Sequence, residues 1–309
     1  MSESLIRSLT LKQLRALAEV ADTGSVSAAA RRLSVTPPAV TMQVQLLEAA
    51  LGLTLLDRTG EKFRPTDAGR EVAAAAARIE AALRDCVAAL EAMKGLDGGR
   101  VAVAIISTAK YFAPMALGVF ARAHPNVDVS LTIGNRAEVI ALLRSDAVDV
   151  AIMGRPPEDL ETEQVVIGDH PHVVIAPPDH PLAGRGPLQP QALTGHTFLM
   201  REQGSGTRGL MERLFGEEGV KPKAGMEIGS NETIKQAVIA GLGLAFISAH
   251  TVAAEVAQGR LVMLDVVGLP IMRQWYVVRR AGKRLTPPAA AMNAFLSERG
   301  AEFLPRSML

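Results

Sequence analysis

Hydrophobic and polar positions divide the chain into four stretches of different character. Residues 1–65 show apolar positions at helical spacing and end in a short segment of strand character, and residues 66–94 read as one long alanine-rich helix. The run Gly95-Leu-Asp-Gly-Gly99 interrupts this pattern, as a linker does. From Arg100 onward short apolar runs alternate with helical segments, which is the order of an α/β unit.

Within the first stretch, the spacing predicts a helix that ends at Thr23-Gly24-Ser25 and a second helix over Val26–Leu33. Glycine suits the end of a helix, and Ser25 can cap the next one. After the turn at Ser34-Val35, Thr36 offers a cap and Pro37 suits the first turn of a third helix, Pro38–Leu51. This order is typical of a helix-turn-helix, although three-helix bundles with other functions share it.

The outward face of the third helix carries hydroxyl and amide side chains without competing negative charge. Such groups can read base edges in the major groove of DNA. The following segment, Leu53 to Gly69, predicts two short strands around a turn at Gly60, whose basic residues would lie beside phosphates; the alternative is that they are solvated turn charges. The predicted DNA-binding residues are Ser34, Thr36, Pro37, Thr41, Gln43, Gln45, Arg58, Lys62 and Arg64.

Residues 9–70 resemble the N-terminal signature of the LysR-type transcriptional regulators almost continuously. The resemblance is carried by Leu11-Lys-Gln-Leu-Arg15, Gly24-Ser-Val-Ser-Ala-Ala-Ala-Arg-Arg-Leu33, Thr36-Pro-Pro-Ala-Val-Thr41, Leu46-Leu-Glu48, Leu56-Asp-Arg58 and Pro65-Thr-Asp-Ala-Gly69. It implies an α+β multidomain protein: an N-terminal winged helix-turn-helix, a long linker helix, and a C-terminal two-lobed α/β periplasmic-binding-protein-like sensor of type II. The sequence departs from the family at Met42, where Arg or Lys is frequent, so a phosphate or base contact is in doubt there.

The long helix predicts self-association. Its apolar residues alternate at spacings of four and three, the a/d pattern of a coiled coil, and they are Val72, Ala76, Ile79, Leu83, Cys86, Leu90 and Met93. The resemblance implies that the same helix of a second subunit covers this seam in a homodimer or homotetramer; the alternative is packing against the chain's own sensor. Cys86 is interpreted as a small core residue of the seam rather than a redox switch.

Composition limits the class of protein. A chain of 309 residues suits two or three domains, and we divide it into 1–65, 66–94 and 95–309, with a first lobe of 100–166 and 270–309 and a second lobe of 167–269. A polar N-terminus and the lack of any long apolar run predict neither export nor a membrane span, and the single cysteine fits the reducing cytoplasm. The net charge of +1 neither favours nor excludes DNA binding, because phosphate attraction is local.

Candidate strands in the sensor end in small polar residues. These strands include Val101–Ile106, Val127–Ile133, Val148–Met153, Val173–Ala176, Thr197–Met200 and Trp275–Arg279. Ligands of open α/β sheets bind beyond the carboxyl ends of strands, near helix N-termini. The segment Met200-Arg-Glu-Gln-Gly-Ser-Gly-Thr-Arg208 combines glycines, hydroxyls and a cation before a helix, which fits an anion site and an ordinary helix-capping turn equally well. Four clusters of this kind at helix starts, taken together, favour an anionic ligand over simple capping.

The predicted effector-binding residues are Ser107, Thr108, Lys110, Asn135, Arg136, Gln203, Gly204, Ser205, Thr207, Arg208, Asn231 and Glu232. We expect Arg208→Ala to abolish the effector response and Gln43→Ala to weaken specific DNA binding more than random binding.

Parts of the sensor resemble the LysR-type subgroup that regulates Calvin-cycle (RuBisCO) operons. The segments are Met200 to Arg208, Gly229-Ser-Asn-Glu-Thr-Ile-Lys-Gln-Ala-Val238, Gly241-Leu-Gly-Leu-Ala-Phe-Ile-Ser-Ala-His250 and Gly268-Leu-Pro-Ile-Met-Arg-Gln-Trp-Tyr-Val-Val278. The resemblance implies activation of carbon-fixation genes with RNA polymerase, in response to a phosphorylated effector of the ribulose bisphosphate, phosphoenolpyruvate, NADPH or ATP class. The alternative within the family is another metabolic operon with a non-phosphorylated effector.

Other chemistry finds less support in the sequence. His170, His172 and His180, with Asp169 and Asp179, could hold a metal, but surface-loop histidines are the commoner interpretation, and His250 is expected to be a packed or loop histidine. We find no catalytic Ser-His-Asp or Cys-His logic, so an enzyme is the less favoured class. A transport binding protein would share the sensor fold but would not carry residues 1–70.

Overall fold

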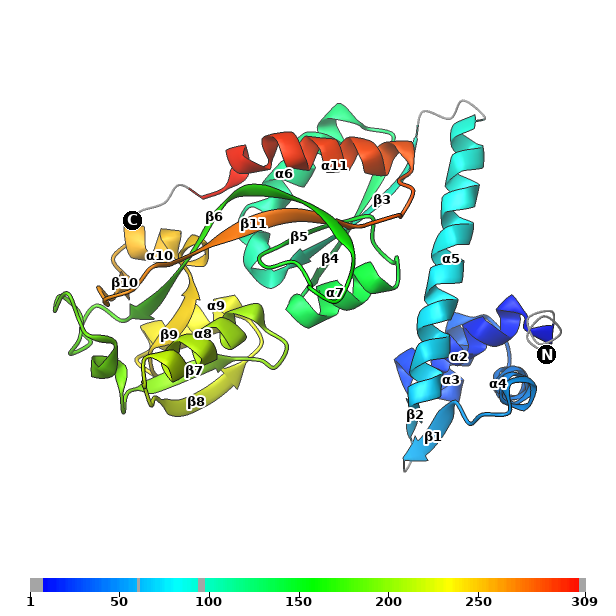
Figure 1. Cartoon of the computed structure of the whole chain (residues 1–309), viewed down its shortest axis with the longest axis horizontal. Helices are drawn as coiled ribbons and strands as arrows, with labels where there is room; N and C mark the ends of the chain where they lie inside the picture. The colour runs from blue at the N-terminus through cyan, green and yellow to red at the C-terminus, as the bar shows by residue number, and fades with distance from the viewer. Residues whose placement is uncertain (1–7, 60–61, 94–97, 306–309) are drawn as a thin grey trace. The chain divides into compact units, whose positions relative to one another are not determined.

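The computed structural model describes residues 8–59, 62–93 and 98–305. Figure 1 shows the order of its helices and strands, and none of the described helices has the length and apolar character that a bilayer crossing needs. Three sequence predictions lie outside the described residues: the polar N-terminus, the turn at Gly60 and the linker from Gly95 to Asp97. The chain divides into two compact units with a boundary at Val87. We call them the head unit and, from Gly98 onward, the C-terminal unit.

Three helices form the first part of the head unit: α2 (Leu11–Thr23), α3 (Val26–Arg32) and α4 (Pro37–Leu51). Gly24 ends α2 in the left-handed conformation at φ +64°, and the Ser25 side chain accepts a hydrogen bond from the backbone N–H of Ala28, as predicted. Thr36 is the N-cap residue of α4 as predicted, although its side chain makes no capping hydrogen bond, and Pro37 lies in the first turn. Small side chains let the helices approach: Ala29 and Ala30 of α3 pack on Ala16, Val20, Val40 and Val44.

The predicted wing is formed by the antiparallel strands β1 (Leu56–Thr59) and β2 (Lys62–Pro65). The Glu48 carboxylate near the end of α4 accepts hydrogen bonds from the backbone N–H groups of Leu55 (2.7 Å) and Leu56 (3.2 Å). These bonds fix the path of the chain from α4 into β1. The backbone N–H of Phe63 donates to the Gly24 carbonyl at 2.9 Å. These bonds connect the wing to α4 and to the turn between α2 and α3.

The long helix α5 (Asp67–Met93) begins against the head core. A Cβ at Gly69 would lie 1.9 Å from the Leu55 carbonyl oxygen, so this close approach requires glycine. Val72 and Ala76 pack on Leu14, Leu17, Leu47 and Leu55, so the first two seam positions face the chain's own head rather than a partner. The later seam residues Ile79 (41%), Leu83 (40%) and Leu90 (53%) are exposed, as is Cys86. The interpretation of Cys86 as a core residue of a seam between two subunits stays a prediction, because its exposure is that of the single chain.

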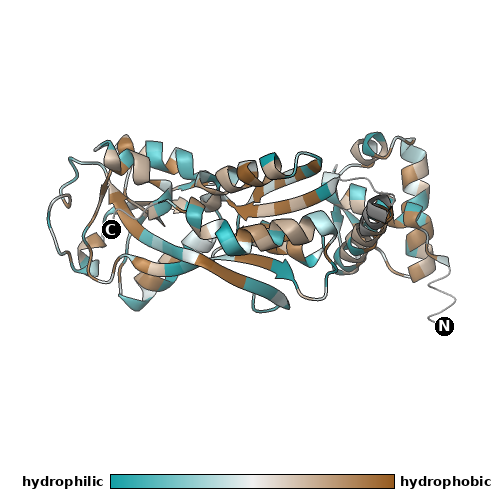
Figure 2. Cartoon of the chain, turned by 90° about the horizontal axis from the view of Figure 1, so that it is seen from above, coloured by the Kyte–Doolittle hydropathy of each residue, from teal (hydrophilic) through white to brown (hydrophobic). Residues whose placement is uncertain are grey.

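One seven-stranded sheet runs through the C-terminal unit in the order β10-β6-β11-β5-β3-β4, with β9 paired to β6. Strand β3 is parallel to β4 and β5, whereas β11 is antiparallel to β5 and β6. The strands are β3 (Gly99–Ile106), β4 (Val127–Gly134), β5 (Val150–Met153), β6 (Thr162–Ala176), β9 (Ala245–Ser248), β10 (Val262–Met263) and β11 (Ile271–Arg280), beside the parallel pair β7 (Thr197–Arg201) and β8 (Lys223–Ile228). Long hydrophobic stretches mark the strands in Figure 2.

Helices cover both faces of this sheet. They are α6 (Ala113–Ala123), α7 (Arg136–Arg144), α8 (Gly206–Glu217), α9 (Asn231–Ile239), α10 (Ala253–Ala257) and α11 (Pro287–Arg299), with the short 3₁₀ turns η1 (Ser107–Tyr111), η2 (Pro190–Leu193), η3 (Ala249–Thr251) and η4 (Gly300–Phe303). Parallel strands buried on both faces carry few polar residues, and all four residues of β5 are buried.

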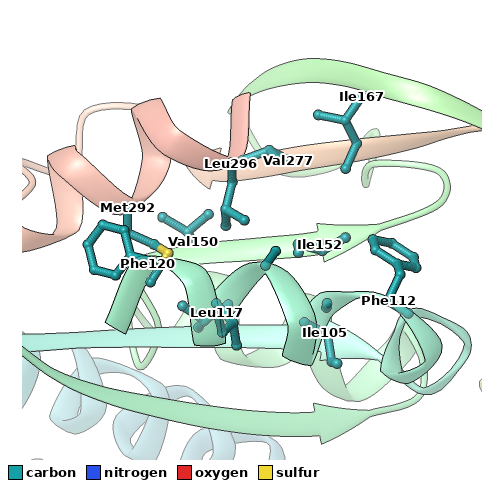
Figure 3. Close-up of a cluster of buried hydrophobic side chains, with 14 of the residues drawn as sticks. Ile105, Phe112, Leu117, Phe120, Val150, Ile152, Ile167, Val277, Met292 and Leu296 are labelled. Carbon is teal, nitrogen blue, oxygen red and sulfur yellow. The ribbon is translucent and has the colours of Figure 1, made fainter. Parts of the chain in front are cut away.

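Two pairs of hydrophobic cores define two lobes. In the first lobe, α6 and α11 pack on one face of β3, β5 and β11 through residues such as Phe120, Met292 and Leu296 (Figure 3), and α7 packs on the other face. In the second lobe, α8 packs on one face of β6, β7 and β9, and α9 on the other. The two lobes thus repeat the same three-layer construction.

Strands β6 and β11 belong to both lobes and run side by side through the unit (Figure 1). Ile167 of β6 lies in a first-lobe core and Val174 in a second-lobe core. On β11, Trp275 lies in the first-lobe core and Ile271 packs against the second-lobe core. The prediction of a strand only at Val173–Ala176 was therefore too short, because β6 begins at Thr162.

Candidate functional site

The outward face of α4 is the candidate DNA-binding face of the head. Thr41 and Gln45 are exposed, and the Thr41 hydroxyl donates to the Pro37 carbonyl at 3.2 Å. Gln43 is only half-buried at the flank of the helix, next to the buried Val40 and Val44. Met42 is 51% exposed, and α4 contains no lysine or arginine. Of the two glutamines predicted to read bases, Gln45 is the more accessible.

The remaining predicted DNA-binding residues flank this face. Ser34 adopts a left-handed backbone (φ +56°) in the exposed turn before α4, and Thr36 and Pro37 follow it at the surface. Lys62 and Arg64 are exposed on β2. Arg58 lies in β1, and its side chain is outside the described structure.

A cavity of about 1150 Å³ lies within the C-terminal unit. It opens beyond the carboxyl ends of the parallel strands β3, β4 and β5 and at the N-terminus of α8, with β6 and β11 also contributing. This is where open α/β sheets bind ligands. Its lining includes Ser107, Thr108, Asn135, Arg136, Gly154, Arg155, Glu158, Asp159, Asp169, His170, His172, Arg201, Gly204, Ser205, Gly206, Thr207, Arg213, Arg273, Gln274 and Tyr276.

Seven of the predicted effector-binding residues line this cavity. They are Ser107, Thr108, Asn135, Arg136, Gly204, Ser205 and Thr207. The two lobes meet at this rim, because the Ala137 N–H donates to the Gly204 carbonyl at 3.3 Å. The Asn135 amide oxygen caps α7 by accepting from the Glu138 N–H at 3.0 Å, which leaves its amide N–H groups for other partners.

The other five predicted residues do not line the cavity. Gln203 is exposed, Lys110 lies 5.2 Å from the Tyr111 ring, and Glu232 pairs with Lys235 at 2.9 Å. Asn231 is fully buried behind the cavity and accepts a hydrogen bond from Arg201. The five predicted residues outside the cavity lining are thus Lys110, Gln203, Arg208, Asn231 and Glu232.

Arg208 is the clearest correction. Its guanidinium pairs with Glu212 (2.8 Å) and Glu227 (2.6 Å), and it also donates to the Arg201 carbonyl at 2.9 Å. The side chain therefore points along α8 toward β8 and supports the backbone at the end of β7. The expectation that Arg208 grips the ligand rested on sequence proximity to the glycines, whereas in the structure this side chain is not part of the cavity lining.

Arg201 is the buried cation of the cavity. It is 3% exposed, and its Nε and Nη2 atoms bond to the Glu202 carboxylate at 2.7 and 2.9 Å. Nη2 also donates to the Ser107 hydroxyl at 3.1 Å, so this side chain joins the second lobe to the first. A guanidinium held by several partners is pre-organised for a carboxylate or phosphate.

Positive charge predominates in the lining. Five arginines line the cavity (Arg136, Arg155, Arg201, Arg213 and Arg273) against three carboxylates (Glu158, Asp159 and Asp169). Arg155 pairs with Glu158. Burial, and then the nearby Arg155, lower the pKa of Arg136, which is the expected effect of confining cations together. An anion in this cavity would be electrostatically favoured.

The prediction that His170 and His172 lie in surface loops is wrong. His170 and His172 are not surface-loop residues: they lie in β6, are buried, and line the cavity. His250 is buried in η3, as expected of a packed histidine, and its Nδ1 accepts a hydrogen bond from the Trp275 indole at 3.1 Å. No group of three or more His, Cys, Asp or Glu side chains in the described part of the chain is arranged to hold a metal.

Sequence reasoning missed Arg155, Arg201, Arg213, Arg273 and both cavity histidines. Arg155 directly follows β5, so the strand-end argument that was applied to Ser107 and Asn135 could have found it. Arg201 lies at the end of β7, inside the segment that drew attention to Arg208. Arg273, His170 and His172 sit inside strands β6 and β11, where no strand-end signal exists.

Comparisons with known proteins agree with this architecture. Residues 11–70 match the family described as "Bacterial regulatory helix-turn-helix protein, lysR family", and residues 94–301 match "LysR substrate binding domain". The "HTH-type transcriptional regulator CbbR" of Xanthobacter flavus is 53% identical over 299 residues, 96% of this chain and 90% of that protein. The "RuBisCO operon transcriptional regulator" of Allochromatium vinosum is 44% identical over 288 residues, 93% of this chain and 95% of that protein.

A solved structure resembles the C-terminal unit. The Synechocystis PCC6803 CcmR regulatory domain, solved in complex with 2-PG, is 40% identical with a TM-score of 0.63, and the match covers 65% of this chain and 96% of that one. These findings confirm the winged helix-turn-helix, the periplasmic-binding-like sensor and the resemblance stated from the sequence. The two family matches cover most of the chain, and the relatives are named as transcription regulators. The protein therefore belongs to the LysR family of DNA-binding transcription regulators.

Proposed function

We propose that this regulator activates Calvin-cycle genes when a phosphorylated metabolite occupies the cavity of its C-terminal unit. The observation that carries the proposal is the cavity itself: five arginines and a helix N-terminus surround a space of about 1150 Å³ at the carboxyl ends of parallel strands. Two kinds of relative support it, one named for the RuBisCO operon and one solved with 2-PG bound. Ribulose bisphosphate, phosphoenolpyruvate, NADPH and ATP are the effector classes to test.

The effector contacts we propose combine predicted and newly found residues. Arg201 and Arg155 supply charge from opposite lobes, and backbone amides at the start of α8, after Ser205, supply neutral donors. Because both lobes line the cavity, a ligand that touches both favours one arrangement of the lobes over others and so shifts their populations. That shift is the signal we assign to the effector.

For DNA, we propose that α4 enters the major groove and that the wing contacts phosphates. Thr41 and Gln45 are placed to read base edges, and Lys62 and Arg64 to bind the backbone. We propose that the protein works in the cytoplasm, where its DNA target would be, with RNA polymerase as its functional partner. The divisions 1–65, 66–94 and 95–309 remain our proposed domain limits.

Self-association follows from the later part of the α5 seam. Ile79, Leu83 and Leu90 leave an apolar stripe exposed on a helix whose earlier positions are already buried. A coiled-coil stripe of this kind needs a partner helix. We propose a second copy of this chain as that partner, in a dimer or tetramer.

The test is thermal unfolding of the full chain against matched pairs of ligands. Phosphoenolpyruvate is compared with pyruvate, ribulose bisphosphate with ribulose, and both with NADPH, ATP and aromatic acids. A ligand bound only by the folded state, at about a hundred times its dissociation constant, adds roughly 2.7 kcal/mol of stability. We expect stabilisation by the phosphorylated member of a pair and none by its partner.

Equal stabilisation by both members of each pair, or stabilisation by an aromatic acid alone, would remove the phosphorylated effector and the carbon-fixation role. The assignment to the LysR family would be unaffected.

A further inference from the structure

Five rings form a continuous column across β6 and β11. The Phe112 ring meets Trp275 edge-on at 5.0 Å, and Trp275 stacks on His170 at 3.8 Å between ring centroids. His170 contacts His172 at 4.3 Å, and His172 stacks near Phe246 at 5.7 Å. Phe112 belongs to a first-lobe core and Phe246 to a second-lobe core. The column therefore joins the two lobes, and its two imidazoles line the cavity.

Hydrogen bonds fix the protonation of two neighbouring rings. The Nδ1 atom of His172 lies 3.1 Å from the His170 carbonyl oxygen, and because a carbonyl only accepts, Nδ1 must carry the hydrogen. The Trp275 indole N–H donates to Nδ1 of His250, so that atom carries none. Neither ring nitrogen of His170 has a hydrogen-bond partner among the described residues, although the side chain is only 3% exposed. A buried imidazole without a partner is unusual.

The surroundings of the pair hold it neutral. Burial, followed by the neighbouring His172 and His250, lowers the pKa of His170 well below its usual value. Burial likewise lowers the pKa of His172 to about 4; the hydrogen bond to the His170 backbone opposes this shift, and Arg273 and His250 add to it.

Charged groups reach the pair from each neighbouring element. In the cavity lining they are Arg273 on β11, Arg201 on β7, Arg155 after β5 and Asp169 on β6, with His250 on η3 behind them. His250 itself has a pKa lowered by burial and raised again by Asp169. Arg201 is paired with Glu202 and Arg155 with Glu158, so Arg273 is the arginine that disfavours an imidazolium at His172, and added negative charge would favour it.

We propose that an anionic effector in the cavity draws a proton onto the His170–His172 pair, so that effector affinity is linked to pH. The proposal rests on the proposed function, because it concerns the same cavity and the same class of ligand. The anion supplies the negative charge that stabilises the imidazolium, beside a cavity-lining histidine whose two ring nitrogens are buried without a partner among the described residues. We assign the proton to the pair because coupled groups titrate together.

The sign of the linkage follows from the two states. The pKa of the pair is higher in the bound protein than in the free protein, so binding takes up a proton. Effector affinity therefore increases as pH falls, by up to about tenfold per pH unit while one full proton is taken up, and it levels off below the pKa of the free pair.

The chain's histidines allow a direct test. All six are in the C-terminal unit, and ¹⁵N labelling of their imidazoles in the full chain gives ring-nitrogen signals that report protonation. His170→Gln and His172→Gln assign the two cavity signals, and His180→Gln is the matched control because His180 does not line the cavity. The pH titration is run with and without saturating phosphoenolpyruvate, with binding confirmed by thermal shift.

We expect phosphoenolpyruvate to raise the protonation midpoint of the cavity pair by at least about one pH unit, and to leave that of His180 unchanged. If phosphoenolpyruvate binds but neither cavity midpoint moves, the proton linkage is wrong and the proposed function stands. If neither phosphoenolpyruvate nor ribulose bisphosphate binds, the phosphorylated effector and the proton linkage both fail. The wild-type titration decides the matter even if one variant does not fold, since the other variant still assigns its signal.

Discussion

The outer face of α4 and the cavity of the C-terminal unit differ in their chemistry. The face of α4 is exposed, comes from one continuous segment, and contains neither lysine nor arginine. The cavity is lined from segments between Ile106 and Tyr276 and contains five arginines and two histidines. The head unit has no histidine at all. If our proposal holds, base recognition by α4 depends on neutral hydrogen bonds, with charge supplied by the wing, whereas ligand recognition depends on confined charge.

The largest expected effect comes from removing Arg201, the buried cation of the cavity. Arg201→Ala is expected to reduce affinity for phosphoenolpyruvate by more than about a hundredfold, because truncating one partner of a buried charged pair costs roughly 2–5 kcal/mol. Titration calorimetry measures the loss. Arg208→Ala is the matched control: that arginine does not line the cavity, so we expect less than about a threefold change.

Arg201 also holds Glu202, Asn231 and Ser107, so its removal lowers stability. Unfolding of the ligand-free variant is therefore measured first, and Arg201→Lys provides a variant that keeps the charge. Unchanged affinity in Arg201→Ala would remove Arg201 from the proposed contacts. A large loss in Arg208→Ala would instead support the sequence-based choice of Arg208.

A second prediction concerns the folding stability that is lost on acidification because of a buried histidine in the C-terminal unit. The pKa of His172 is lowered from 6.5 to about 4, so the unfolded chain binds this proton below pH 6.5 while the native chain does not. The stability it contributes is present above pH 6.5 and is lost as pH falls toward 4, by roughly 3 kcal/mol for the full shift. Urea unfolding followed by the fluorescence of Trp275, the only tryptophan, reports this loss.

Carboxylates also titrate in this range, so the measured quantity is the difference between the chain and His172→Gln. The variant should lose less stability between pH 7 and 4.5 than the native chain does. Identical losses of stability in the two proteins would mean that His172 is charged in the native protein or is not buried.

The smallest effect concerns the two glutamines of α4. Gln45→Ala should weaken binding to an operator selected from a random library by about 1–3 kcal/mol and leave random DNA nearly unaffected, since an exposed amide can read a base edge. Gln43→Ala should cost less, because Gln43 lies beside the buried face of the helix. Electrophoretic mobility shifts on both DNAs measure the contrast.

Lys62→Ala is the control for backbone contact. It should weaken both DNAs equally and lower the slope of log affinity against log salt by about one. A larger specific loss in Gln43→Ala than in Gln45→Ala would restore the assignment made from the sequence.

Local features of the fold were predictable from the sequence, and side-chain direction in the cavity was not. Gly24 and Ser25 fix a helix end and a helix start by their own chemistry, so the head could be derived from neighbouring residues. Strand β6 was recognised only at its apolar end, because polar residues begin the strand and Pro171, which reads as a break, precedes the apolar end.

The cavity depends on contacts between distant segments. Arg201 and Arg208 lie in one motif, yet β7 directs the first into the cavity and α8 directs the second toward Glu212 and Glu227. His170 faces the cavity only because β6 pairs with β11 in a register that sets it opposite Arg273. Sequence spacing carries no information about either arrangement.

The path of the two shared strands also sets the order in which the protein is completed during synthesis. The head core needs nothing beyond the first turns of α5, so it is complete early. The first lobe begins at β3 but obtains Trp275, Val277 and Leu296 only after the whole second lobe has been made. Domains fold as units while the chain emerges. A ribosome that stalls before β11 therefore leaves a nascent chain with a finished face of α4 and an unfinished cavity.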